Sequence, residues 1–276
     1  MPMLDRAALL SVLDRYLDAL HRGGDANAMF APSARVTENG SSNASNFWTS
    51  ARPTGYRLVF ADEESAEVGC HATFSENEMI GICSLRLKFD GSGRIAEAES
   101  LVARKGDSNA FAPHRLTTPD PVYERIEPLA SRLSRDRLVA AADAYFDAVE
   151  RSDAAGAPIA ERCDRIENGL RTTSNPSGGL PLNCREGMTI FTYIDRVRDR
   201  RYPLVDEARG LVWASAALEV PKDSVLRLVV DGKTIERPQA ERSIFLSELF
   251  KVVDGEIAAI DVVVRNMPKG ASFGLA

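Results

Sequence analysis

The chain has 276 residues, 44% of them hydrophobic and 27% charged, values typical of a soluble globular protein with one large or two small domains. Its net charge of −6 argues against nucleic acid or an anionic membrane as a partner. The three histidines lack the spacing of metal ligands, which argues against a zinc site. The four cysteines contain no Cys-x-x-Cys pair and are too few for a disulfide framework. No apolar run nears the roughly 20 residues of a bilayer span, which argues against a membrane helix.

The N-terminal segment predicts an amphipathic helix followed by strands. Apolar residues recur at helical spacing at Leu9, Leu10, Leu13, Leu17 and Leu20. After the sequence Glu-Asn-Gly at 38–40 and an irregular loop, β-rich runs cover 66–74, 79–89 and 94–104, with a turn at 90–94. This order predicts an α+β unit over residues 1–104.

Residues 105–133 contain Pro113, Pro119, Pro121 and Pro128, which argues for a linker without regular structure. The first residues, MPMLDRAALL, carry charges within their apolar run and lack the apolar core of a signal peptide. Together with the unpaired cysteines, this composition predicts a cytoplasmic protein.

Residues 134–276 repeat the first pattern. A second amphipathic helix is indicated by Leu138, Val139, Ala142, Phe146 and Val149. Glu-Asn-Gly recurs at 167–169, a Ser/Asn/Gly/Pro-rich loop covers 172–187, and β-rich runs follow at 211–220, 243–253 and 256–265.

The similarity between the two halves extends to residue identities. With an offset of 129 residues and no gaps, segment 14–40 matches segment 143–169 at 11 of 27 positions. A repeat of this kind predicts two structural units built on one plan.

The segment RYLDALHRGGDANAMFAPSARVTENG resembles the opening of a nuclear transport factor two-like (SnoaL-like) domain, and within that superfamily it is similar to ketosteroid isomerase. The resemblance implies α+β architecture with two tandem cone-shaped domains, each a curved antiparallel sheet wrapped around helices and enclosing an apolar pocket. It places Tyr16 on the tyrosine of the oxyanion hole and Glu38 on the aspartate base. The tandem layout and the ending RNMPKG also resemble a largely uncharacterised bacterial and fungal family of two such domains.

Two residue pairs of the repeat are candidates for chemistry. In an apolar cone, Glu38 and Glu167 would have a raised pKa and could move protons near neutral pH; alternatively, each caps its loop or pairs with an arginine. Tyr16 and Tyr145 could donate a hydrogen bond to an oxyanion, or be core aromatics.

Asymmetric residues indicate which half is active. His71 lies mid-strand in the first half where the second has Ser215, and histidine suits acid–base work at pH 7, although it could equally be a structural residue. We therefore expect the active pocket in the first half, with Glu38, His71 and Tyr16 as catalytic residues.

Further residues are assigned to substrate binding. Trp48 lies in a polar loop and could close a pocket mouth or pack on the linker. One strand face carries Arg196, Arg198, Arg200 and Tyr202 by period two. This row could bind a carboxylate or phenolate, or it could be a solvated face or pair with the nearby Asp195 and Asp199. The expected substrate-binding residues are Trp48, Tyr145, Glu167, Arg198, Arg200 and Tyr202.

No phosphate-binding loop or metalloprotease motif occurs, so we expect neither a cofactor nor a metal. The resemblance predicts a cofactor-independent lyase, eliminating water or formaldehyde, or an isomerase, acting by side-chain acid–base catalysis on a small, mostly apolar hydroxylated aromatic compound. The alternative is a non-catalytic small-molecule-binding or scaffolding protein. We expect the halves to form a pseudo-dimer within one chain, and a homodimer of the chain is a further option.

Overall fold

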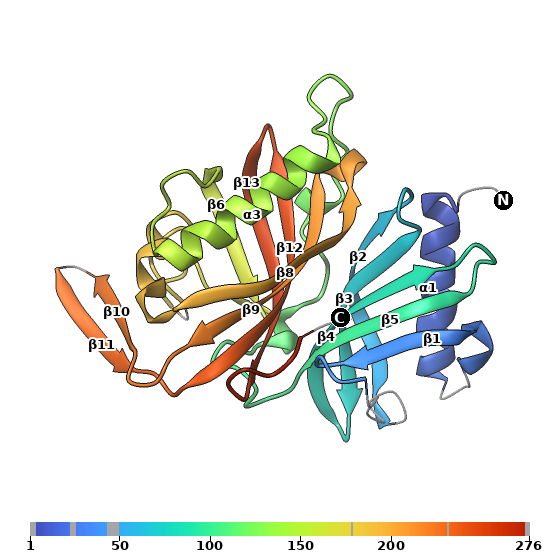
Figure 1. The fold of residues 1–276 in the computed structure, drawn as a ribbon, viewed down its shortest axis with the longest axis horizontal. Helices are drawn as coiled ribbons and strands as arrows, with labels where there is room; N and C mark the ends of the chain where they lie inside the picture. The colour runs from blue at the N-terminus through green and yellow to red at the C-terminus, as the bar shows by residue number, and fades with distance from the viewer. Residues whose placement is uncertain (1–3, 23–25, 43–49, 178, 231, 274–276) are drawn as a thin grey trace.

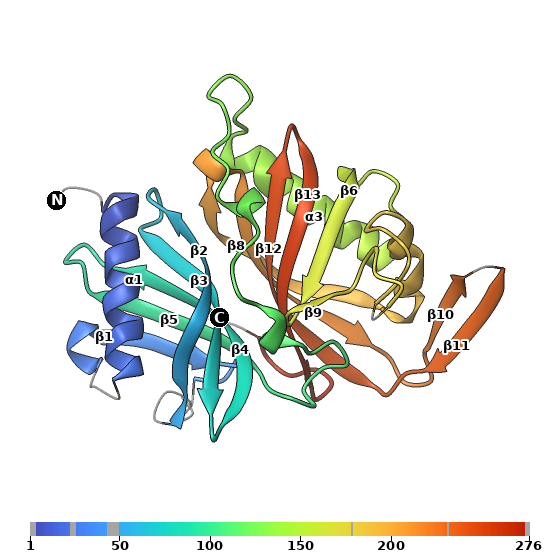
Figure 2. The same ribbon diagram turned by 180° about the vertical axis from the view of Figure 1, so that it is seen from behind.

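A computed structural model describes residues 4–22, 26–42, 50–177, 179–230 and 232–273. The chain forms two halves, and within the described residues an α-helix lies across one face of a curved sheet in each half (Figures 1 and 2). The first half contains α1 (Arg6–His21) and a sheet of order β1-β5-β4-β3-β2. Its strands are β1 (Phe30–Glu38), β2 (Arg52–Asp62), β3 (Glu67–Glu76), β4 (Met79–Phe89) and β5 (Ile95–Ala103), with the 3-10 turn η1 (Asn27–Met29) before β1.

The second half contains α3 (Arg135–Arg151) and a sheet of order β7-β6-β13-β12-β9-β8. Its elements are β6 (Ile159–Glu167), β7 (Leu170–Arg171), η4 (Glu186–Tyr193), β8 (Arg196–Asp206), η5 (Glu207–Arg209), β9 (Leu211–Val220), β12 (Arg242–Val253) and β13 (Glu256–Met267). A separate hairpin, β10 (Val225–Val230) and β11 (Lys233–Pro238), is inserted between β9 and β12. Apart from β7, the second sheet repeats the order of the first, with β6, β13, β12, β9 and β8 in the places of β1, β5, β4, β3 and β2. The predicted α+β class with two tandem cone-like domains is confirmed.

One detail of the predicted sheets is wrong. β1 pairs with β5 in parallel, and β6 pairs with β13 in parallel, so each sheet is mixed rather than antiparallel. β1 and β5 are not joined by a hairpin, because the chain passes from β1 to β2 at the opposite edge and returns through β3 and β4. No tight turn therefore requires the β1–β5 pair to be antiparallel.

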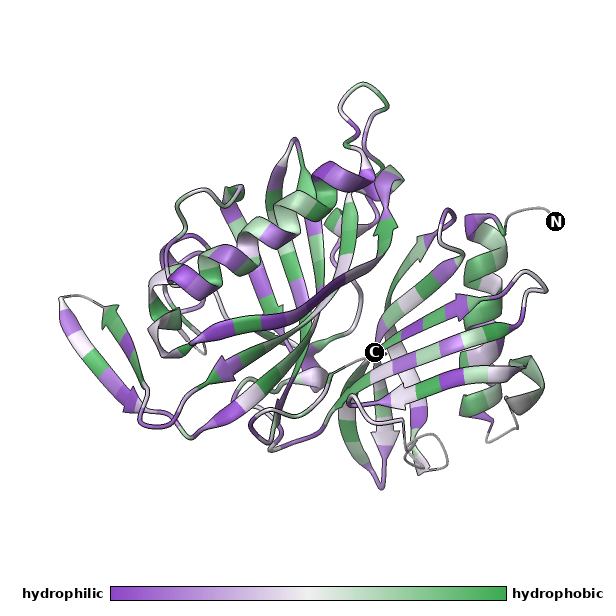
Figure 3. Ribbon diagram, in the orientation of Figure 1, coloured by the Kyte–Doolittle hydropathy of each residue, from purple (hydrophilic) through white to green (hydrophobic). Residues whose placement is uncertain are grey.

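The interior of each cone is an apolar core between the helix and its sheet. Leu9, Leu13 and Leu17 of α1 face the first sheet, and Tyr145 and Phe146 of α3 face the second. In Figure 3, hydrophobic residues concentrate in the central strands, while α3 turns hydrophilic residues outward. Among the residues that the structure describes, no helix combines the length and the hydropathy needed to cross a bilayer.

The doubled Glu-Asn-Gly segment bridges the sheet edge in both halves. The Asn39 side-chain oxygen accepts the Val102 backbone N–H at 2.8 Å, and the Asn168 oxygen accepts the Val264 N–H at 3.0 Å. The asparagine and the glycine that follows it have positive φ in both halves, with the glycines at +79° and +83°. Asn-Gly tolerates this backbone, so these two letters of the repeat have a structural role.

The two sheets pack against each other through the faces that do not carry the helices. This inter-sheet core contains Tyr56, Phe60, Leu204, Trp213 and Leu249, among others. The indole nitrogen of Trp213 donates to the Ser84 hydroxyl across the interface at 3.0 Å. Consequently β9 is buried along its entire length.

The segment between the halves is docked rather than free. It forms two 3-10 turns, η2 (Pro113–Arg115) and η3 (Pro121–Tyr123), and Tyr123 is buried in the inter-sheet core. Near its end, the Glu127 carboxylate accepts from the buried Lys251 ammonium at 2.7 Å. The segment therefore adds contacts to the interface between the halves.

A reciprocal pair of ion contacts joins the halves at the helix N-termini. Arg6, the first residue of α1, pairs with Asp206 of the second half, and Arg135, the first residue of α3, pairs with Asp62 of the first half at 2.5 Å. Asp62 and Asp206 end the equivalent strands β2 and β8, and both are buried. The repeat thus produces the same contact twice, in opposite directions.

This arrangement predicts that Arg135→Ala destabilises the protein. The substitution leaves the buried Asp62 carboxylate without its cation, so we expect the free energy of unfolding to fall by about 1.5–3 kcal/mol, as for a lost hydrogen bond to a charged group. Urea unfolding measures the change. Arg227→Ala, which breaks the exposed Arg227–Glu236 pair, is the matched control, with an expected change of less than about 0.5 kcal/mol. Equal losses in the two variants would contradict the role assigned to the reciprocal pair.

Candidate functional site

A buried polar cluster lies inside the second cone, between α3 and the second sheet. Its centre is Arg165 of β6, which is 7% exposed. The Arg165 Nε donates to Glu167 at 2.9 Å, and Nη1 donates to the Tyr145 hydroxyl at 3.0 Å and to the Glu248 carboxylate. We call these four residues the Arg165 cluster.

Strand and helix periodicities bring the cluster together. Side chains alternate along a strand, so Arg165 and Glu167 face the same interior as the core residue Cys163. Glu248 of β12 lies between two inward-facing core residues of its strand, and Tyr145 projects from the buried face of α3. Three elements distant in sequence therefore converge on one guanidinium.

The charges of the cluster depend on one another. Burial raises the pKa of Glu248, and the Arg165 guanidinium opposes that rise. Burial by itself would lower the pKa of Arg165, but Glu248, Tyr145 and Glu167 raise it well above its usual value, so Arg165 stays cationic. Burial also raises the pKa of Tyr145, which keeps the phenol protonated. One cation is thus shared by two carboxyl groups.

Hydrogen-bonding capacity is left over in the cluster. Within the described part of the chain, the buried Glu248 Oε2 has no hydrogen-bond partner, and none is found for Arg165 Nη2. A buried polar atom without a partner is costly, so Glu248 Oε2 is a position where a water or ligand would be stabilised.

A cavity of about 40 Å³ adjoins the cluster. It lies beneath η4 and the loop 172–187, and its lining residues are Tyr145, Arg165, Glu167, Thr172, Thr173, Leu180, Cys184, Gly187, Ile190 and Phe191. One water occupies roughly 30 Å³ of liquid, so the cavity as it stands accommodates about one water.

The equivalent cone of the first half lacks two of these charges. Strand pairing places Val36 where the second half has Arg165, and Leu85 where it has Glu248. Tyr16 is 4% exposed and contacts Phe30 edge-to-face, and burial raises its pKa. Glu38 closes the sheet edge through its backbone, and its carboxylate lies 3.4 Å from the Asn39 amide.

His71 does not lie in the first cone. Val68, Cys70 and Ala72 of β3 face that cone, so His71 faces the second sheet, where its Nδ1 is 2.6 Å from Asp261 Oδ1 and its ring meets Phe60 edge-to-face. It is fully buried there. The prediction that His71 and Glu38 share one pocket is therefore wrong.

The predicted arginine row on β8 is also wrong. Asp199 has a φ of +54°, and the strand register shifts next to it, so a bulge interrupts the alternation. Arg198 pairs with Asp199 and Glu219, whereas Arg200 and Tyr202 turn to the other side and pair with acidic residues of α3. Trp48, the remaining predicted binding residue, lies outside the described residues.

Sequence reasoning missed Arg165 and Glu248. A signal existed for each, because both positions break the repeat: a charged residue stands where the first half has an aliphatic one. Glu248 also interrupts the apolar run SIFLSELFKVV at an inward position. As for metals, the described part of the chain contains no group of three or more His, Cys, Asp or Glu side chains arranged to hold an ion.

Comparisons with known proteins add the following. Residues 131–264 match the family model of a domain of unknown function, DUF8021. No curated protein matches the chain. A protein of unknown function with a cystatin-like fold from Methylobium petroleophilum PM1 is 23% identical, covering 40% of this chain and 85% of its own, with a TM-score of 0.33. A steroid delta-isomerase from Pseudomonas aeruginosa is 14% identical, covering 37% of this chain and 83% of its own, with a TM-score of 0.30.

The raised pKa of Glu248 predicts a pH-dependent stability. Because its folded pKa lies above its unfolded value, Glu248 stabilises the fold at low pH, and this contribution is lost as the pH rises from about 4.3 through the folded pKa. The wild type should therefore lose stability relative to Glu248→Gln as the pH rises, by at most about 1.4 kcal/mol per pH unit.

Urea unfolding of both proteins at several pH values measures this difference. Glu256→Gln, at an exposed position of β13, is the matched control. If the free energy of unfolding of the wild type, relative to that of Glu248→Gln, stayed constant or increased with pH, the result would count against a raised pKa.

Proposed function

We propose that the second cone binds a small, mostly apolar compound with a carbonyl or phenolic oxygen and moves a proton on it without a cofactor. The observation that carries this proposal is Arg165, a buried cation in the cavity wall with Glu167 beside it and Nη2 without a partner in the described residues. A guanidinium N–H held in a buried site stabilises negative charge that develops on an oxygen.

Glu167 is the acid–base group in this proposal. Its side chain is 25% exposed, lies in the cavity wall and accepts from Arg165 Nε. The carboxylate removes a proton from a carbon next to the substrate carbonyl, and the electron pair moves onto the carbonyl oxygen, which Arg165 Nη2 and the Tyr145 hydroxyl stabilise. Return of the proton to another carbon completes an isomerisation. Departure of a hydroxide, which takes up the proton as water, completes an elimination.

Glu248 acts through Arg165 in this scheme. It is fully buried behind the guanidinium and, with Tyr145, fixes its orientation. A locked guanidinium needs no reorganisation when charge forms on the substrate, which is the condition for effective electrostatic stabilisation. Glu248 is therefore a positioning residue.

The rest of the lining fits an apolar ring. Leu180, Ile190 and Phe191 provide apolar contacts, and Thr172 and Thr173 lie close to the cluster. This combination suits a hydroxylated aromatic compound, the substrate class implied by the resemblance to SnoaL-like domains. Entry of the ring requires η4 and the loop over the cavity to open.

A second candidate function is binding without turnover. The observation that favours it is the pairing of Arg165 with two carboxyl groups in a cavity of about 40 Å³, which leaves only Nη2 for a ligand. The two functions differ in whether Glu167 exchanges a proton with the bound molecule.

Hydrogen–deuterium exchange tests both. The protein is incubated in D₂O with a panel of small aromatic ketones, and NMR follows deuterium at the carbon next to the carbonyl. We expect catalysed exchange with at least one ketone, and a rate about 100- to 10,000-fold lower for Glu167→Gln, because a positioned acid–base group is lost.

The matched comparison is Glu38→Gln, the same change at the equivalent position of the first cone. Loss of exchange in Glu38→Gln but not in Glu167→Gln would move the active site to the first cone. Saturable ligand binding without any exchange would favour the binding function. Circular dichroism melting confirms that each variant is folded.

A further inference from the structure

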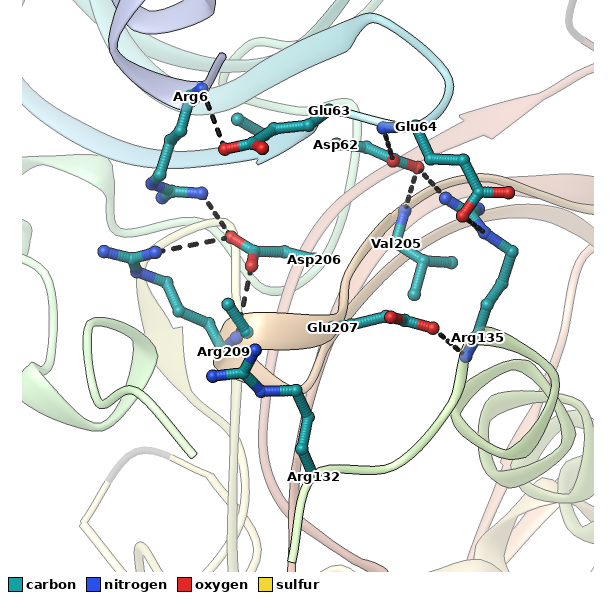
Figure 4. Close-up of a pocket in the computed structure, with 12 residues that line it drawn as sticks. Arg6, Asp62, Glu63, Glu64, Arg132, Arg135, Val205, Asp206, Glu207 and Arg209 are labelled. Carbon is teal, nitrogen blue, oxygen red and sulfur yellow. Dashed lines mark hydrogen bonds and ion pairs between the residues drawn. The ribbon is translucent and has the colours of Figure 1, made fainter. Parts of the chain in front are cut away.

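A second cavity, of about 410 Å³, lies between the halves and is independent of the site in the second cone. Figure 4 shows its lining side chains, which come from the N-terminal ends of α1 and α3 and from the turns after β2 and β8. The lining residues are Arg6, Ala61, Asp62, Glu63, Glu64, Arg132, Arg135, Val205, Asp206, Glu207, Ala208 and Arg209. The volume falls in the range of small-molecule sites.

The two halves differ in the charged residues of the turns that line this cleft. The first half reads Asp-Glu-Glu-Ser at 62–65, and the second reads Asp-Glu-Ala-Arg at 206–209. Glu64 is thus replaced by Ala208, and Ser65 by Arg209. The turn of the first half therefore carries one more carboxylate, and the turn of the second half carries one more guanidinium.

The basic side, which we call the arginine end, consists of Arg6, Arg132 and Arg209. Asp206 pairs with Arg6 and lies 3.8 Å from an Arg209 nitrogen. Arg132 Nη2 donates to the backbone carbonyl of Glu127 at 3.2 Å, and its buried Nε has no partner among the described residues. In the described part of the chain, Asp206 therefore lies against two of these guanidinium groups, and the third, that of Arg132, forms no ion pair.

The cleft already holds anionic oxygens at both helix N-termini. The Glu63 carboxylate accepts the backbone N–H of Arg6 at 2.9 Å, and the Glu207 carboxylate accepts that of Arg135. Helix N-termini favour negative charge, so these two glutamates are in the positions where an anion is stabilised. Neither of them pairs with Arg132.

We propose that the arginine end binds the phosphate group of a small phosphorylated compound. Guanidinium groups recognise phosphate through paired N–H donors, and a dianionic phosphate offers three terminal oxygens to three arginines. At the opposite end of the cleft, Asp62 and Glu64 share the single cation of Arg135, so this end keeps an excess of negative charge and disfavours a second anionic group. The ligand is therefore a monoester whose other end is neutral or cationic.

Isothermal titration calorimetry of the full chain at low salt tests this proposal with phenyl phosphate, inorganic phosphate and succinate. We expect phenyl phosphate to bind with a submillimolar Kd and at least tenfold more tightly than succinate. Weaker binding of inorganic phosphate than of phenyl phosphate identifies an ester as the ligand, whereas equal binding overturns that part of the proposal.

Arg132→Gln and Arg209→Gln should each weaken phenyl phosphate binding at least tenfold, while Arg227→Gln on the hairpin β10–β11 should leave it unchanged. Arg132→Lys, which keeps the charge but loses the paired donors, should bind with intermediate affinity. The absence of binding to wild type at millimolar concentration, or equal binding by all variants, overturns the proposal. Thermal melting of each variant without ligand shows whether it is folded.

Discussion

The packing of the two sheets against each other is the constraint on which the rest of the structure depends. It buries the central strands on both faces, one against a helix and one against the other half. Polar groups on the inner faces must then find partners across the interface, as Trp213 does with Ser84 and His71 with Asp261. The helices lie on the outer faces of the sheets, so the interior of each cone is separate from that of the other half. The residues inside one cone can therefore differ from those inside the other.

The two cones show what that independence permits. The same strand positions carry Val36 and Leu85 in the first half and Arg165 and Glu248 in the second. The cleft at the helix N-termini differs in a similar way, with Arg209 replacing a serine of the first half. Shared residues of the repeat, such as the two asparagines, hold the sheet edges. The halves differ at Arg165, Glu248 and Arg209, whereas Glu167 and Tyr145 have identical counterparts in the first half.

Sequence predicted the architecture well because the repeat and the alternation of apolar residues are local signals. It could not say which face of a fully buried strand meets which neighbour, and His71 was assigned to the wrong side for that reason. It could not locate the bulge at Asp199, which depends on pairing with β9. Glu167 lies in a cavity wall beside Arg165, but Glu248, the other carboxyl group on Arg165, is 81 residues from Glu167 along the chain and is brought there only by the fold.

Stability alone does not account for the Arg165 cluster. Replacing a buried ion pair with apolar side chains is often neutral or stabilising, because removing charges from water costs several kcal/mol per ion. The first half folds with aliphatic residues at the same two positions, the buried Leu85 and the exposed Val36. The second cone retains a buried cation and a carboxyl oxygen without a partner in the described residues. Such an arrangement, next to a cavity and beneath a covering loop, is explained more readily by a ligand than by packing.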